Sequence, residues 1–219
     1  GQDALSLLKT GRWMWSGDAL GREGAQLLAE VAAEQGDTDT ALWALHNLLR
    51  TAPEEEAGAL RAQARAIYGA FYAEGAAGEI DLGPFLEGHT RISARWRFDP
   101  GFVGHAMAVP QRLLDTGMTA LAAREYRALR EMAQTLERGG ATAPDASLMA
   151  RLRRGEARAL LAGGQADAAV DLLSGYADDQ GAEAEALLVE ALAQAGRSDE
   201  LAALRLRAQD MDLRRSRAV

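Results

Sequence analysis

Three arginines with helical spacing are the residues of this sequence best suited to recognising another molecule. Arg151, Arg154 and Arg158 stand at positions i, i+3 and i+7, so a helix through them places all three on one face. A guanidinium group binds a carboxylate in a forked geometry, which suits such a face to acidic groups. The alternative is a solvated face whose arginines pair with nearby glutamates, including Glu156. The sequence leaves both interpretations open.

Residues for catalysis or metal binding form no recognisable motif. The three histidines, His46, His89 and His105, stand far apart, and none belongs to an HExxH or ExxH arrangement. The sequence has no cysteine, and no nucleophile elbow, phosphate-binding loop or dinucleotide-binding fingerprint. We therefore expect no enzymatic activity, no metal and no cofactor. His46 is expected to be partly buried on a helix.

Two tryptophans near the start of the chain, Trp13 and Trp15, are two residues apart. On a helix this spacing points the two indoles to different faces, so one neighbour cannot bury both. One tryptophan is then a core anchor, and the other is exposed for contact with a partner. The alternative is that both fold onto the helices that follow, as an N-terminal cap.

The composition predicts an all-α fold. Apolar residues make up 48 % of the 219 residues, alanine is abundant, there are only five prolines, and no long alternating Val/Ile/Thr run suggests a sheet. The net charge of −8 argues against nucleic acid as the partner. No apolar run approaches the length of about 18 residues that crosses a bilayer, so we expect no transmembrane segment.

The basic residues also suggest a source. Lys9 is the only lysine among 24 basic residues, and such a bias towards Arg and Ala is typical of GC-rich bacterial coding sequences. A chain without cysteine fits either side of a bacterial membrane. A start at Gly1 without Met is expected of a processed or trimmed chain. Between the periplasm and the cytoplasm we favour the periplasm.

The stretch from Arg22 to Glu55 has the pattern of a helical hairpin. Leu28 and Ala29 stand at packing positions of a first helix, and Gly36-Asp37 makes the turn. Ala41, Leu45 and Leu48 then line the inner face of a second helix, and Pro53 follows where that helix stops. This pattern resembles the tetratricopeptide repeat (TPR). Ala25 and Ala32 stand where the family has Trp and Tyr in the first helix.

Further units of this kind follow along the chain. Turn glycines and close-packing alanines recur at Gly117 with Ala122 and at Gly164 with Ala169, and Gly196 marks the last turn. The TPR resemblance implies antiparallel helix-hairpin repeats forming a right-handed superhelix, a TPR-like α-solenoid. The alternative is an ordinary Ala-rich helical bundle, since glycines after helices are expected there too.

The second unit departs from this pattern. We expect Gly75 and Gly78 to break its first helix, Leu60–Glu74, and Asp99-Pro100 to end its second. The third unit has Pro110 inside its first helix, which predicts a late start or a kink there. The predicted organisation is an N-terminal cap at 1–21, three repeats at 22–138, a hinge at 139–147, two repeats with a C-terminal cap at 148–213, and a basic tail at 214–219.

The resemblance to the TPR family implies where a partner binds. The first helix of each TPR lines a concave groove, which places Arg151, Arg154 and Arg158 in the groove of the fourth unit. By the same mapping four residues of the first unit lie in this groove or at its edge: Glu23, Gln26, Glu30 and Glu34. A groove that is acidic at one end and basic at the other orients a bound acidic or C-terminal peptide. Chaperone-binding members clamp a terminal carboxylate with asparagines, and such a clamp is not expected here because Asn47 is the only asparagine.

The resemblance thus implies a non-enzymatic scaffold that holds a peptide or helix of a partner protein in its groove. The alternative is a helical accessory subunit of a bacterial envelope assembly, such as pilus, outer-membrane or polysaccharide machinery. An all-α enzyme ranks third, because it needs a polar cluster in a pocket that no spacing here demands. The final helix, predicted at Glu200–Leu213, is polar enough to cap the array, so we favour a monomer over a homodimer.

Overall fold

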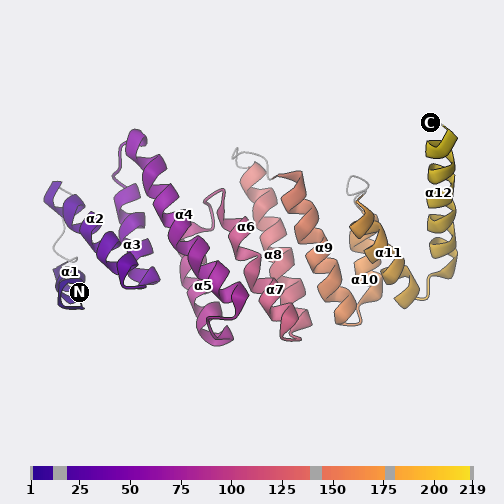
Figure 1. The fold of residues 1–219 in the computed structure, drawn as a ribbon, viewed down its shortest axis with the longest axis horizontal. Coiled ribbons are helices and arrows are strands. Elements are labelled where there is room, and N and C mark those ends of the chain that lie inside the picture. The colour runs from indigo at the N-terminus through magenta and orange to yellow at the C-terminus, as the bar shows by residue number, and fades with distance from the viewer. Residues whose placement is uncertain (1, 12–18, 139–144, 176–180, 218–219) are drawn as a thin grey trace. The chain divides into compact units, whose positions relative to one another are not determined.

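The computed structural model describes residues 2–11, 19–138, 145–175 and 181–217, and it divides the chain into two compact units, Gly1–Arg112 and Leu113–Val219. All regular elements of the described residues are helices (Figure 1), which confirms the predicted all-α fold. Unit 1 holds α1 (Gln2–Gly11), α2 (Ala19–Glu34), α3 (Thr38–Leu49), α4 (Glu54–Ala77), α5 (Leu82–Trp96), α6 (Phe102–Ala106) and most of α7 (Ala108–Asp115). Unit 2 holds the end of α7, α8 (Thr119–Arg138), α9 (Ala146–Ala162), α10 (Ala166–Ser174), α11 (Ala182–Gln194) and α12 (Ser198–Arg217).

The same turn ends a helix at five places in the described residues. A glycine with φ between 70° and 82° follows the helix each time: Gly36, Gly78, Gly117, Gly164 and Gly196. The residue after each glycine donates its backbone N–H to the carbonyl five positions earlier, at 2.8–3.0 Å. This is the hydrogen bond that closes a helix with a left-handed residue, a conformation that glycine adopts without steric cost. Four of these five glycines were predicted as turns from the sequence.

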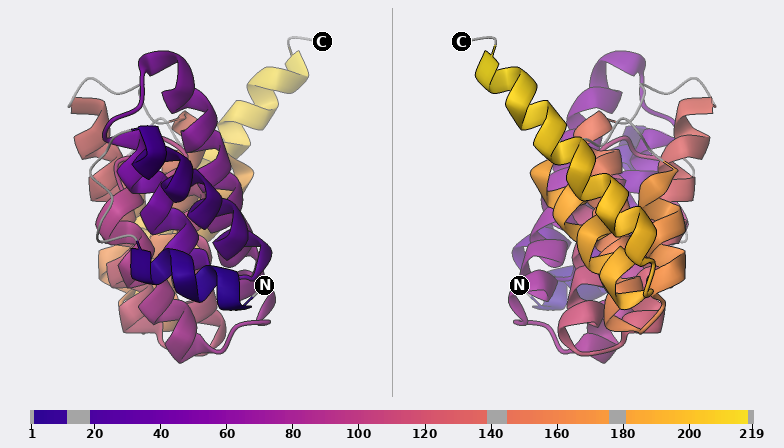
Figure 2. Two further views of the ribbon diagram at one scale, coloured as in Figure 1. Left: turned by 90° about the vertical axis from the view of Figure 1, so that its left-hand side faces the viewer. Right: turned by 90° about the vertical axis from the view of Figure 1, so that its right-hand side faces the viewer.

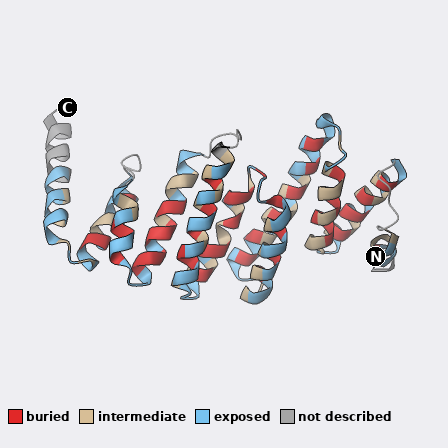
Figure 3. Ribbon diagram, turned by 180° about the vertical axis from the view of Figure 1, so that it is seen from behind, coloured by how far each residue is buried: buried red, intermediate tan, exposed pale blue. Residues whose placement is uncertain are grey.

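Small residues bring the paired helices close together. Ala41, Ala122 and Ala169 have no exposed surface, which confirms them as close-packing positions. In unit 2, α9 packs against α8 and α10, and it also contacts α11, the first helix of the next hairpin. In unit 1, α4 contacts α3, α5 and α6. Figure 2 shows the helices in two further views, and Figure 3 shows the buried residues mainly on the sides of the helices that face their neighbours.

The irregular second unit differs from its prediction. Gly75 does not break α4, because the helix continues to Ala77 and ends at the left-handed Gly78. Gly75 is buried within it, and a Cβ placed there would lie 2.0 Å from the ring of Phe85 in α5. The glycine therefore serves close approach of two helices, which a sequence pattern does not distinguish from a helix break. Pro110 lies in the first turn of α7, where proline is tolerated, and one residue separates α7 from α6. The helix is thus interrupted just before the proline, and a late start and a kink stay the two predicted alternatives.

Few of the predicted segment boundaries can be compared with the structure. Residues 139–144 of the predicted hinge lie outside the described residues. The same holds for residues 1 and 12–18 of the predicted N-terminal segment. Asp145 caps α9 by accepting the backbone N–H of Ser147 at 3.1 Å. α12 extends through Arg217 and packs against α11, with Leu201 and Leu204 half-buried. The cap and tail boundaries stay predictions.

Aromatic side chains form the core of unit 1. Tyr68 and Tyr72 of α4 are fully buried, and their rings contact each other and that of Phe102 edge to face, at centroid distances of 6.0–6.4 Å. The Tyr72 hydroxyl shares a 2.8 Å hydrogen bond with Nδ1 of His89, whose ring stacks on Phe102. Trp96 is buried beside Tyr68. This cluster joins α4, α5 and α6, and two of these helices, α4 and α5, carry part of the site described below.

Two glycines of α4 give a matched test of this packing. Gly75→Ala should lower the free energy of unfolding by about 1–3 kcal/mol, because the new methyl group overlaps the ring of Phe85. Gly58→Ala in the same helix should raise it by about 0.5–1 kcal/mol, because nothing lies within 4 Å of the added Cβ. Urea unfolding followed by circular dichroism measures both. A Gly75→Ala variant as stable as Gly58→Ala would contradict the packing of α4 on α5.

Candidate functional site

An arginine-rich cavity of about 520 Å³ lies in unit 1, where α3 and α5 end beside α4. The end of α3 provides one wall, α4 a second, and the end of α5 with its following loop the third. The lining residues are His46, Leu49 and Arg50, then Arg61 and Arg65, then Arg95, Trp96, Phe98, Asp99 and Pro100. Cavities of this size hold small organic ligands in many proteins.

Asp99 fixes the loop that forms one wall of the cavity. Its buried carboxylate accepts hydrogen bonds from the Arg65 guanidinium at 2.9–3.2 Å, from the Tyr68 hydroxyl at 2.9 Å and from the Gly101 backbone N–H at 3.0 Å. A Cβ at Gly101 would lie 2.5 Å from Nε of Arg65, so glycine is required for this approach. Burial, followed by the hydrogen bond to Asp99, raises the pKa of Tyr68 above its ordinary value. The carboxylate is thus fully engaged in holding the loop to α4.

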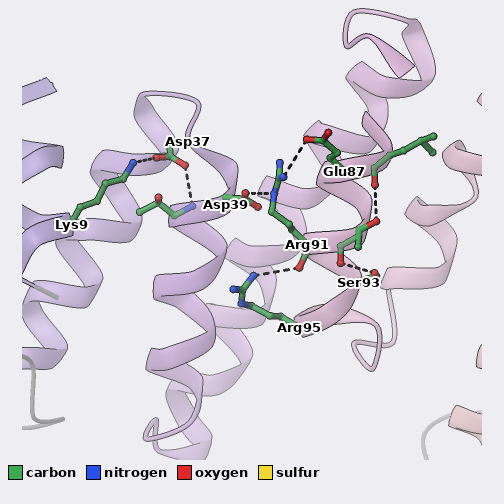
Figure 4. Close-up of polar contacts among 10 residues, drawn as sticks. Lys9, Asp37, Asp39, Glu87, Arg91, Ser93 and Arg95 are labelled. Carbon is green, nitrogen blue, oxygen red and sulfur yellow. Dashed lines mark hydrogen bonds and ion pairs between the residues drawn. The ribbon is translucent and has the colours of Figure 1, made fainter. Parts of the chain in front are cut away.

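The remaining arginines of the cavity have no acidic partner among the described residues. These three form no ion pair with any residue that the structure describes: Arg50, Arg61 and Arg95. Arg91, one turn before Arg95 in α5, pairs with Asp39 of α3 and lies 3.7 Å from Glu87 (Figure 4). Within the described part of the chain, the Arg95 guanidinium donates only to the backbone carbonyl of Arg91, at 3.4 Å. α5 therefore carries two different arginines. Arg91 is neutralised and lies outside the cavity, whereas Arg95 lines the cavity and has no acidic partner among the described residues.

The positive charge of the cavity affects the pKa of His46. It is half-buried, as predicted, and its ring meets that of Trp96 edge to face at 5.9 Å. Burial lowers the pKa of His46, and the charges of Arg95 and Arg50 lower it further. His46 is therefore neutral at pH 7 and adds no positive charge of its own. Trp96 Nε1 is buried and has no hydrogen-bond acceptor among the described residues.

The predicted arginine stripe lies on α9 in unit 2. Arg154 contacts one carboxylate oxygen of Glu183 in α11 at 2.9 Å, and Arg158 contacts the other oxygen. Both arginines therefore share one face, directed at the first helix of the next hairpin. Arg151 is exposed and forms no ion pair within the described residues. Its charge contributes to lowering the pKa of Asp145, after the hydrogen bonds from Ser147.

Glu156 was named from the sequence as a partner of this stripe, and the structure contradicts that assignment. Glu156 is buried and accepts hydrogen bonds from Nε of Arg127 at 2.9 Å and from Nε of Arg130 at 3.1 Å, both in α8. Position 156 lies on the opposite side of α9 from Arg154 and Arg158, so it faces the preceding hairpin. Tyr126 packs nearby, and burial raises the pKa of its hydroxyl to about 12.

The four residues predicted for the groove of the first unit lie on the exposed side of α2. Glu23, Glu30 and Glu34 are exposed, and Gln26 is half-buried and donates to Glu30 at 2.8 Å. They belong to unit 1, whereas the arginine stripe belongs to unit 2, so a single groove with acidic and basic ends stays a prediction. Trp13 and Trp15 lie outside the described residues, and their partner role also stays a prediction.

The described part of the chain has neither a metal-binding cluster nor a membrane-spanning helix. There, no three His, Asp or Glu side chains gather where they could hold a metal ion. None of the described helices is both long and apolar enough to cross a bilayer. His89 and His105 belong instead to the aromatic core, where they contact Tyr72 and Tyr68.

Known proteins were compared with the chain. No family model matches it, and no curated protein matches it. Two crystal structures of Podosopora anserina putative kinesin light chain nearly identical TPR-like repeats, one of them a form with a single substitution, are similar at 15 % and 14 % sequence identity. Each alignment covers 99 % of this chain and 96 % of the other, with TM-scores of 0.47 and 0.46. Such values carry no argument about function. The TPR-like helical-hairpin architecture rests on the chain's own turns and helix pairs, and the bacterial source stays a prediction.

The cavity of unit 1 was not predicted from the sequence. Its arginines come from three helices in two different hairpins, so no spacing along the chain brings them together. Two partial signals exist, because Arg61 and Arg65 are four residues apart and Arg50 follows directly on the end of α3. The position of Asp99 in the structure shows that Arg65 is the neutralised arginine of the cavity.

The buried His89 makes unit 1 sensitive to acid. Burial lowers the pKa of His89 from 6.5 to about 4. His89 takes up a proton more readily in the unfolded chain than in the folded one. The free energy of unfolding should therefore keep its full value above pH 6.5 and decrease as the pH drops towards 4. The loss attributable to His89 is about 3 kcal/mol. Urea unfolding at a series of pH values between 7 and 4 measures it.

A His89→Gln variant is the control for this effect, because other groups titrate in the same range. The variant should lose less stability than the wild type between pH 6.5 and pH 4, whatever its stability at pH 7. Equal losses in the two proteins would show that His89 is not held neutral by the core.

Proposed function

We propose that this chain is a non-enzymatic scaffold that binds an acidic segment of a partner protein on the α9–α11 face of unit 2. The observation that supports this proposal is the sharing of one carboxylate, Glu183, by Arg154 and Arg158, with Arg151 exposed one turn earlier. Three guanidinium groups in a row on one helix face can each bind a carboxylate of an extended or helical peptide.

The internal ion pairs do not block this role. Arg158 and Glu183 are about half exposed, with 45 % and 51 % of their side-chain surface accessible, whereas Arg154 has 16 % accessible. Ion pairs at such positions contribute only about 0–1 kcal/mol to stability, since water already screens them. A carboxylate of a partner can therefore replace Glu183 on Arg158 at little cost. Glu183 holds the two arginines in place until that happens.

The first test is reversal of charge on this face. Arg151→Glu combined with Arg154→Glu should abolish recovery of the partner in a crosslinked affinity purification from the native organism, because two binding groups become repulsive. The control is Arg205→Glu with Arg207→Glu, two exposed positions of α12 in the same unit. Circular dichroism must show wild-type helicity for both variants. A partner recovered equally with both double variants would refute the α9 face as its binding site.

A second variant tests the replacement of Glu183. Glu183→Gln removes the competing carboxylate and should strengthen binding of the recovered partner about twofold to fivefold, in line with the small worth of an exposed pair. Fluorescence anisotropy with the partner's acidic segment measures the change. Weaker binding than wild type would mean that Glu183 belongs to the binding surface rather than competing with the ligand.

A further inference from the structure

We infer that the arginine-rich cavity of unit 1 is a second binding site, for a small ligand that carries two or more closely spaced phosphate or carboxylate groups. The cavity lies entirely within unit 1, and the proposal does not depend on the α9 face of unit 2. Its support comes from the charges and the positions of the lining residues, of which Arg50, Arg61 and Arg95 are exposed and accessible to a ligand.

The chain does not neutralise this cavity with its own acids. Four arginines line it, and the single acidic lining residue, Asp99, is already bound by Arg65, Tyr68 and Gly101. Among the described residues the Asp99 carboxylate pairs with Arg65 and with none of the other three arginines of the cavity. Elsewhere in unit 1 cations do find acidic partners, as Arg91 does with Asp39 and Lys9 with Asp37 (Figure 4). The cavity thus concentrates uncompensated positive charge in a chain whose net charge is −8.

Helix ends explain only part of this arrangement. Arg50 caps the end of α3 and Arg95 lies in the last turn of α5, where a cation is favoured by the helix dipole. Arg61 has no such reason, because it lies in the N-terminal part of α4. It also has no acidic partner among the described residues, whereas Arg65, four residues later, is paired with Asp99. A bound anion would supply the partner that Arg61 lacks.

The lining also indicates the kind of ligand. Guanidinium groups bind phosphate and carboxylate in a forked geometry, and several of them suit a group with more than one charge. Leu49, Trp96 and Pro100 supply apolar surface, and Phe98 is 63 % exposed with the Arg97 guanidinium 4.9 Å from its ring centroid. A volume of about 520 Å³ fits a small organic anion. Long nucleic acids are disfavoured, since a net charge of −8 repels a polyanion outside the cavity.

Isothermal titration calorimetry at low ionic strength tests the proposal with two probes, pyrophosphate and citrate. At least one should bind the full chain at one site. Arg50→Gln combined with Arg95→Gln should weaken that binding about tenfold or more, because two charge-assisted contacts are lost. The matched control is Arg91→Gln, which removes a cation from α5 that already has its partners, and its affinity should stay within about twofold of wild type.

The two probes also distinguish the source of the charge. Binding of pyrophosphate alone assigns the site to phosphate ligands, and binding of citrate alone assigns it to carboxylate ligands. Binding of both supports recognition by charge. No saturable binding of either probe to the folded wild type overturns the proposal, as does equal loss in the Arg91→Gln control. The Arg151→Glu/Arg154→Glu variant should bind the probe as wild type does, so failure of one site is separable from failure of the other.

Discussion

A helix that ends in a left-handed glycine is the constraint on which the hairpins of this chain depend. The chain must reverse within two or three residues, and the turn leaves carbonyls of the preceding helix without partners. The left-handed residue turns the next N–H back to one of these carbonyls, as seen after Gly36 and Gly164. A residue with a Cβ would adopt this conformation only at a cost of about 1–2 kcal/mol. Each turn then sets which face of the next helix packs against its neighbour, and alanines such as Ala41 allow close approach.

Buried acids organise the charges of each unit. Asp99 in unit 1 and Glu156 in unit 2 are both buried, and each is held by arginines of a neighbouring helix. A buried carboxylate is tolerated only when such donors satisfy it, and loss of one donor would leave a costly unpaired charge. Among the arginines that have no buried acid as partner, those on α9 and those around the cavity at the ends of α3 and α5 form the two surfaces to which we assign binding.

The hairpin architecture could be predicted from the sequence because its signals are local. Turn glycines, close-packing alanines and the stop at Asp99-Pro100 act within a few residues of their position, and the structure confirms them. Gly75 was misjudged because a glycine that admits Phe85 has the same local pattern as one that ends a helix. Glu156 was misassigned for a related reason, since its partners come from another helix. The cavity of unit 1 depends on contacts between two hairpins, and no local spacing contains that information.

The central claim is that the cavity of unit 1 retains positive charge that the chain's own acids do not neutralise. A proton NMR titration of His46 at low ionic strength tests it most directly, with a His46→Gln variant to assign the resonance. In the free protein the pKa of His46 should lie below 6.5, and it should rise when Arg50 and Arg95 are replaced by glutamine, because both charges lower it. A wild-type pKa at or above 6.5 that does not change in this variant would contradict the account.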